Sequence, residues 1–181
     1  MNKKPKLATI QKGDDEKYPL SSFEYQKILT PKLDARKNDF NQEIINEIVL
    51  WKVNRYAELS DDLLALINKI SPNDLVIDET LTREVLEGLL NTAGVRLAMA
   101  STILRFKNSH IYQIIDQRVY RYVYGECVKY PYNKEKQVDF YLDYLKILRK
   151  KCKECNVPFE HSDRILYLAD KEKNKSAKIE Y

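Results

Sequence analysis

Asp116 is the residue of this 181-residue chain whose setting best suits chemistry on a substrate. It follows two isoleucines in the stretch IYQIIDQRVYR and starts a predicted helix, so its carboxylate borders an apolar segment. The plain interpretation is a helix N-cap, because aspartate is a preferred residue at that position. The functional interpretation is a carboxylate at the mouth of a cleft, where it could stabilise a developing cation or activate a water molecule.

Basic residues accompany this aspartate. Between Gly94 and Gly125 the only acidic side chain is Asp116, whereas five side chains are basic: Arg96, Arg105, Lys107, Arg118 and Arg121. A lone carboxylate in a basic setting favours a phosphate-binding face over an ordinary solvated one. The net charge of the whole chain, +4, permits an anionic partner without requiring one.

A glycine turn lies upstream, between two stretches with helical periodicity. Gly94 is one of only four glycines, and it separates TREVLEGLLNT from VRLAMASTILRF. A glycine in such a turn supplies a positive φ or lets another backbone approach closely. The second helix begins with free N–H groups that attract an anion, and Arg96 adds a positive charge at the same end. Taken alone, this pattern indicates a packed helical hairpin.

Together the two stretches resemble the helix-hairpin-helix DNA glycosylase superfamily over about residues 80–125. The first part of the family pattern is filled by Leu90, Gly94, Val95, Ala100 and Leu104. The second part is filled by Ile114, Ile115, Asp116, Val119 and Arg121. Asp116 follows Leu104 by twelve residues, a spacing expected of adenine-glycosylase-like members.

The resemblance implies a partner and a mechanism. Duplex DNA would bind through the hairpin, directly or through a bound monovalent cation, and a damaged or mismatched base would be flipped into a pocket. Asp116 would be the catalytic carboxylate of a monofunctional glycosylase. The DNA contacts would come from Thr92, Gly94, Val95, Arg96, Arg118 and Arg121, and a base could stack on Tyr112 or Trp51.

The chain departs from the family pattern in three places. Arg96 replaces the second hairpin glycine, so its side chain could take over a backbone contact to phosphate. Ala98 stands where bifunctional members carry a Schiff-base lysine, so lyase chemistry by that route is not expected. Cys127, Cys152 and Cys155 are too few and wrongly spaced for the family's iron–sulfur cluster, so we interpret them as structural or surface thiols and expect no metal.

The rest of the chain predicts a helical scaffold. Hydrophobic periodicity indicates an all-α bundle of about seven helices. Residues 1–17 are expected to form a flexible basic arm, 18–174 a single helical domain with the helix-hairpin-helix at 82–106, and 175–181 a charged tail. Thr80 or Thr82 is expected to cap the helix before Gly94. No apolar run is long enough for a membrane span, so we expect a cytoplasmic protein, with a monomer favoured.

Two other functions stay open at this point. One is a catalytically silent helix-hairpin-helix module that binds DNA, with Asp116 acting only as a cap. The other is a helical protein-interaction domain that binds no nucleic acid. The salt dependence of DNA binding separates these two, because phosphate contacts weaken steeply as salt rises. The sequence does not specify the target base.

Overall fold

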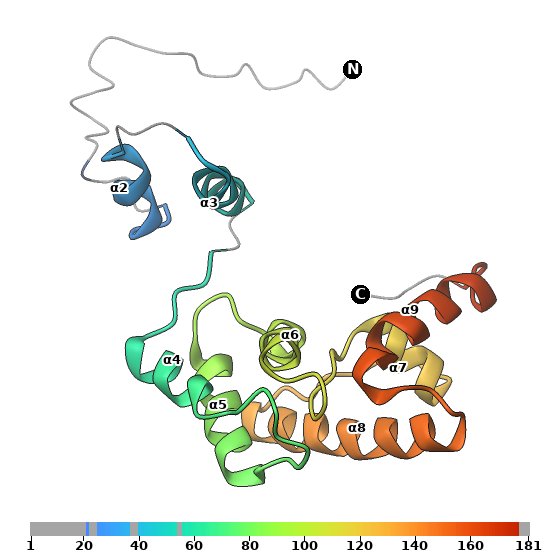
Figure 1. Ribbon diagram of the computed structural model, residues 1–181. Helices are drawn as coiled ribbons and strands as arrows, with labels where there is room; N and C mark the ends of the chain where they lie inside the picture. Colours follow the sequence, from blue (N-terminus) through green and yellow to red (C-terminus); the bar gives the residue numbers. More distant parts are fainter. Residues whose placement is uncertain (1–20, 22–24, 37–39, 54–55, 178–181) are drawn as a thin grey trace, which may run out of the picture. The chain divides into compact units, whose positions relative to one another are not determined.

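The computed structural model describes residues 21, 25–36, 40–53 and 56–177. Within these residues the structure has eight α-helices, a 3₁₀-helix at Phe159–His161 and no strand, which confirms the all-α fold (Figure 1). None of the described helices is both long and apolar enough to cross a membrane. The predicted arm at 1–17 and the last four residues of the predicted tail lie outside the described residues.

The chain divides into two compact units, residues 1–56 and 57–181, where the sequence predicted one helical domain over 18–174. The boundary falls in the segment between α3 (Gln42–Lys52) and α4 (Asp61–Asn68), whose described residues 56–60 form no helix. Helical periodicity reports which faces of a helix are apolar but not which helices share a core. The sequence pattern therefore did not reveal this division.

The first unit pairs α2 (Leu29–Asp34) with α3. Leu29 and Ile44 are its buried apolar side chains among the described residues. Trp51 packs edge-on against Tyr25, with ring centroids 5.1 Å apart, and its Nε1–H donates to Thr30 Oγ1 at 2.9 Å. These contacts fix the tryptophan within its own unit.

The second unit holds the remaining helices. They are α4, α5 (Glu79–Asn91), α6 (Leu97–Lys107), α7 (Gln117–Tyr124), α8 (Lys134–Glu154) and α9 (Ser162–Lys173). The helix-hairpin-helix predicted at 82–106 corresponds to α5, a short turn and α6. In Figure 1 the long helix α8 lies beside α5 and below α6 and α7 in the view.

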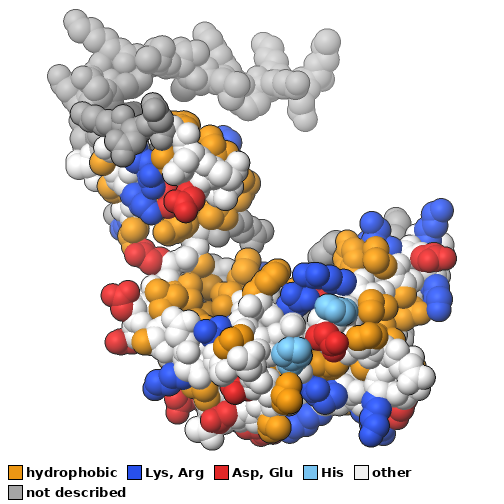
Figure 2. Space-filling view, viewed as in Figure 1, with side chains coloured by type: hydrophobic (Ala, Val, Ile, Leu, Met, Phe, Trp, Pro, Cys, Tyr) orange, Lys and Arg blue, Asp and Glu red, His pale blue; other side chains and the backbone are white. Residues whose placement is uncertain are grey.

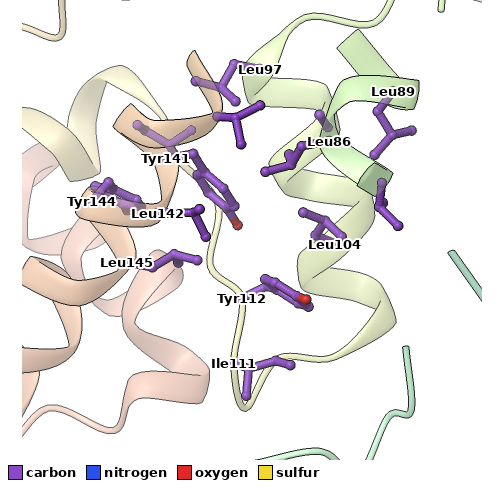
Figure 3. Close-up of a cluster of buried hydrophobic side chains, with 14 of the residues drawn as sticks. Leu86, Leu89, Leu97, Leu104, Ile111, Tyr112, Tyr141, Leu142, Tyr144 and Leu145 are labelled. Atoms are coloured by element: carbon purple, nitrogen blue, oxygen red, sulfur yellow. The ribbon is translucent and has the colours of Figure 1, made fainter. Parts of the chain in front are cut away.

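Apolar side chains of α5, α6 and α8 meet in one core (Figure 3). Tyr141 and Tyr144 of α8 are buried in it, and each hydroxyl donates to a backbone carbonyl of the segment before α7: Tyr141 to Gln113 and Tyr144 to Ile114, both at 2.9 Å. A buried tyrosine hydroxyl needs a partner, so these two bonds fix the segment before α7 against α8. That segment positions Asp116.

Short polar side chains cap five of these helices. Their side chains accept a hydrogen bond from a backbone N–H in the first turn; they are Asn41, Ser60, Asp78, Asp116 and Asn133. The expectation that Thr80 or Thr82 caps α5 is wrong, because Asp78 does so. Thr82 instead lies inside the helix, where its buried hydroxyl contacts Tyr112 Oη at 2.6 Å.

Candidate nucleic-acid interface and carboxylate pocket

The hairpin is a tight turn between two helices that share the core. The N–H of Val95 donates to the carbonyl of Thr92 at 3.1 Å, and Gly94 between them has φ of +80°. Residues with a side chain rarely adopt this left-handed conformation, which accounts for the glycine. Val95 is buried at 5% exposure and anchors the turn to the core, while Gly94 stays exposed. The turn therefore presents its backbone to solvent in a fixed conformation.

The start of α6 differs from the five capped helices. Its N-cap position is Arg96, whose exposed side chain makes no capping hydrogen bond. The first-turn N–H groups of α6 carry the positive end of the helix dipole without a side-chain acceptor. The hairpin thus joins a helix N-terminus and a guanidinium, two features that both favour an anion.

A groove of about 530 Å³ lies directly beside the hairpin, and we call it the hairpin groove. One wall comes from the end of α5 and the start of α6, and the other from the loop before α8 and its first turn. The lining residues are Leu90, Val95, Arg96, Leu97, Ala98, Tyr130, Pro131, Tyr132, Lys134 and Gln137. Two cations and no acid line it. The other eight lining residues are uncharged, and most of them are apolar or aromatic.

Asp116 lies at the N-cap of α7. Its Oδ1 accepts a hydrogen bond from the N–H of Val119 at 2.7 Å. The preceding Ile115 is fully buried, and its N–H donates to Ser101 Oγ of α6 at 3.2 Å. Burial raises the pKa of Asp116, whereas the N–H of Val119 and the charge of Arg118 act in the opposite direction. The predicted aspartate is therefore a partly buried, well-positioned carboxylate.

A second cavity, of about 350 Å³, contains this carboxylate, and we call it the carboxylate pocket. It lies between the end of α6, the segment before α7 and the first half of α9. The lining residues are Phe106, Ile114, Asp116, Asp163, Arg164, Tyr167 and Leu168. Figure 2 shows charged and histidine side chains among apolar areas on a face of the second unit. Two aromatic rings and two carboxylates in one pocket suit a planar ligand that carries hydrogen-bonding groups along its edge.

Tyr130 links the hairpin groove to the segment before α7. Its ring lines the groove, and its hydroxyl lies 3.5 Å from the carbonyl oxygen of Ile115, the residue before Asp116. The pKa of Tyr130 is raised to about 12, mainly by burial and in smaller part by the negative charge of Asp116. Tyr130 thus reaches from the hairpin groove to the backbone of the residue before Asp116.

The two arginines of α7 do not form part of an open basic face. Arg121 is 8% exposed and holds Asp170 of α9 through two hydrogen bonds, at 2.9 and 2.7 Å. Arg118 also reaches Asp170, at 3.2 Å, and lies over the ring of Tyr167. Arg121 therefore serves to join α7 to α9, and we remove it from the set of DNA contacts. Arg118 is partly exposed and borders the carboxylate pocket through Tyr167.

The two predicted stacking residues are placed differently from that expectation. Tyr112 is 1% exposed, and its hydroxyl contacts Thr82, so it is a core side chain. Burial is also the main reason why its pKa is raised. Trp51 is partly exposed but belongs to the first unit. We therefore include neither in the site built from the second unit.

The cysteines form no metal site in the described part of the chain, where no three His, Cys, Asp or Glu side chains gather in a way that could hold an ion. Cys152 is buried, Cys155 is exposed and Cys127 lies between these extremes. Burial raises the pKa of Cys152, which disfavours its thiolate. Cys152 is thus a buried thiol with a disfavoured thiolate, and Cys155 is an exposed one.

The sequence did not point to four of the aromatic side chains of this site: Phe106, Tyr130, Tyr132 and Tyr167. Two of them belong to the stretch YPYN, which reads locally as a turn. The other two lie on helices more than fifty residues apart. Turn signals and helical periodicity carry no information on which aromatic rings will line one cavity.

Comparisons with models of known protein families, with curated proteins and with solved structures found no match for this chain. The resemblance to helix-hairpin-helix glycosylases thus stays a prediction from its motifs.

Proposed function

We propose that this chain binds duplex DNA through its hairpin and acts as a monofunctional N-glycosylase, with Asp116 as its catalytic carboxylate. The observation that carries the proposal is the arrangement of the hairpin, the groove and the carboxylate within the second unit. A hairpin with an anion-attracting end lies beside a groove, and Tyr130 of that groove contacts the backbone of Ile115, whose neighbour Asp116 lies in an aromatic pocket. This arrangement matches what base excision needs. One part must bind the DNA strand, and a pocket must receive the base and contain a carboxylate.

The hairpin supplies the hold on the strand. A DNA phosphate meets the exposed turn at Gly94, the uncapped N–H groups of α6 and the Arg96 side chain. Contacts of this kind position a protein on DNA without reading its sequence. A monovalent cation at the hairpin carbonyls would serve the same purpose. Such binding is expected to weaken with salt.

The carboxylate pocket receives the extruded base. Phe106 is 70% exposed and Tyr167 is 36% exposed, so both rings offer area for stacking. Asp163 is held in an ion pair with Arg105, at 3.2 Å, and both side chains are buried. An extruded base is recognised by stacking between such side chains and by hydrogen bonds to its edge.

Asp116 supplies the chemistry. Cleavage of the N-glycosidic bond leaves positive charge on the sugar, and a nearby carboxylate stabilises it. The base leaves with the electron pair of the broken bond and takes up a proton from solvent. A water molecule then adds to the sugar carbon and releases one proton to solvent. The partial burial of Asp116 strengthens its interaction with a developing cation, because solvent screens it less. Ala98 stands at the position where bifunctional members carry a Schiff-base lysine, so that position supplies no amine.

The test is a base-release assay on duplexes that each carry one damaged or mismatched base, followed by alkaline cleavage at abasic sites. The variants are Asp116→Asn and the matched control Asp78→Asn. Asp78 caps α5 as Asp116 caps α7, and its Oδ1 accepts from the N–H of Leu81 at 3.0 Å, outside both cavities. Asparagine caps a helix almost as well as aspartate, so both variants are expected to fold.

We expect Asp116→Asn to lose base release by at least about 100-fold, the usual contribution of a catalytic carboxylate, while DNA binding persists. Asp78→Asn should release the base as the wild type does. Equal release by wild type and Asp116→Asn would refute the role of Asp116.

A catalytically silent DNA-binding module is the second candidate, and one observation favours it. The Asp116 carboxylate already accepts the N–H of Val119, so a structural role as a cap accounts for its presence. Binding that falls steeply with salt, without base release from any lesion, would support this candidate. Failure to bind any duplex at low salt would refute both candidates and leave a protein-interaction domain.

A further inference from the structure

Tyr132 is the most exposed large side chain of the hairpin groove. Its relative exposure is 105%, so nothing in the described residues covers its ring. The neighbouring Tyr130 is 37% exposed and packs edge-on against Phe140, with ring centroids 6.2 Å apart. One tyrosine thus anchors the loop, while the other projects from it. An uncovered aromatic ring at a groove is a typical contact residue for a partner.

The loop that carries Tyr132 is held in place on both sides. Before it, the carbonyl of Pro131 accepts a hydrogen bond from Gln137 Nε2 at 2.7 Å. After it, Asn133 caps α8 by accepting from the N–H of Lys136 at 3.1 Å. A ring on a fixed loop loses little conformational freedom on binding, so its contacts contribute more to affinity.

The charges of the groove indicate which partner fits. Arg96 stands on one wall with an exposed side chain, and Lys134 stands opposite on the first turn of α8. Lys134 Nζ donates to Asn91 Oδ1 at 2.7 Å, which places this ammonium next to the hairpin. Two cations without an acid, together with aromatic and apolar walls, match a nucleotide: phosphate for the cations and a base for the ring.

We propose that the hairpin groove binds an unpaired nucleotide of the DNA strand, with its phosphate between Arg96 and Lys134 and its base stacked on Tyr132. This proposal rests on the DNA binding proposed above and adds a second recognition point, separate from the carboxylate pocket. DNA with an unpaired base is then preferred over a perfect duplex. The preference depends on the ring of Tyr132 and not on its hydroxyl.

The test compares two DNA probes of equal length, a fully paired duplex and a duplex with a single bulged 2-aminopurine. Binding is measured for the wild type, Tyr132→Ala and Tyr132→Phe. Phe40→Ala serves as the matched control, because it removes another exposed aromatic ring, 67% exposed, from the first unit. Since Tyr132 makes no core contact, Tyr132→Ala is expected to fold, which circular dichroism checks.

We expect Tyr132→Ala to bind the bulged duplex at least about 5-fold more weakly than the wild type, the lower end for loss of one stacking contact. Affinity for the paired duplex should change by less than about 2-fold, because no unpaired base is available to stack. Tyr132→Phe and Phe40→Ala should bind like the wild type. The 2-aminopurine fluorescence should be quenched by the wild type and by Tyr132→Phe, but not by Tyr132→Ala.

Three results would overturn the proposal. One is equal affinity of wild type and Tyr132→Ala for the bulged duplex, and another is an equal loss on both duplexes. The third is a wild-type dimer that Tyr132→Ala converts to a monomer in sedimentation, which would assign the groove to a second copy of the chain. A wild type that binds neither duplex would instead refute DNA binding itself, so failure of the groove and failure of the proposed function are distinguishable.

Discussion

Two regions of the second unit each hold a carboxylate and an arginine, and they use them in opposite ways. At the interface of α7 and α9, Arg121 and Asp170 are buried and bonded to each other. At the hairpin and the carboxylate pocket, Arg96 is exposed and Asp116 is bonded only to backbone N–H groups, with no cationic side chain paired to it at hydrogen-bond distance among the described residues. The first region neutralises its charges, whereas the second presents them to a ligand.

The pKa values of the two carboxyl groups express the same difference. Burial raises the pKa of both. For Asp170, hydrogen bonds from Arg121, Asn174 and Arg118 outweigh burial, so the net shift is downward. For Asp116, burial outweighs the backbone N–H groups, so the net shift is upward. A raised pKa in a cavity is a common property of functional carboxylates, and a lowered one in an ion pair is typical of structural roles.

The largest effect on stability is expected from Asp170→Ala, which removes the carboxylate of the buried ion pair between α7 and α9. The substitution removes the anionic partner of the buried Arg121 guanidinium, whose Nη1 also donates to the carbonyl of Ala177 at 3.2 Å. Breaking a buried ion pair by removal of one partner costs about 3 kcal/mol of the free energy of unfolding. Urea denaturation measures the loss. A change of less than about 1 kcal/mol would show that the pair is well solvated and that the contrast between the regions is weaker than we infer.

The next effect is a pH dependence of opposite sign at the two carboxylates. The raised pKa of Asp116 means that its contribution to stability is full below the unfolded pKa and is lost as pH rises through the folded pKa. The lowered pKa of Asp170 means that its contribution is present above the ordinary value of 3.8 and is lost as pH falls through the folded pKa.

The measurement is urea denaturation of wild type, Asp116→Asn and Asp170→Asn between pH 7 and about pH 2.5, on both sides of the ordinary carboxyl pKa of 3.8. Relative to the wild type, Asp116→Asn should gain stability as pH rises. The deficit of Asp170→Asn should shrink as pH falls below 3.8. Two difference curves with the same slope would contradict the assignment of opposite environments.

The hairpin and the capping role of Asp116 could be predicted from the sequence better than the buried pair of Arg121 and Asp170. The hairpin turn and the N-cap at Asp116 depend on local chemistry, a glycine with positive φ and an aspartate before a helix, which a short stretch of sequence displays. The pairing of Arg121 with Asp170 joins residues 49 positions apart, and no local pattern reports it. Arg96 and Arg121 therefore looked equivalent as DNA contacts, although only Arg96 is exposed.

The same reason explains the cavities. Phe106 of α6 and Tyr167 of α9 line one pocket because α7 packs against α9, a tertiary contact that helical periodicity does not encode. Tyr112 looked like a stacking residue because tyrosine suits both a wet surface and a core with one hydrogen-bond partner. Its partner, Thr82, lies thirty residues earlier.

The smallest effect on stability is expected from Arg96→Ala, which tests the hairpin alone. The side chain is exposed and caps nothing, so the free energy of unfolding should change by less than about 0.5 kcal/mol. DNA binding should nevertheless weaken, and the slope of log affinity against log salt should fall by about one, the share of a single phosphate contact. Titrations of one duplex at several salt concentrations measure that slope. An unchanged slope would mean that the hairpin holds DNA without Arg96, because the uncapped N–H groups of α6 and the turn at Gly94 would then supply the whole phosphate contact.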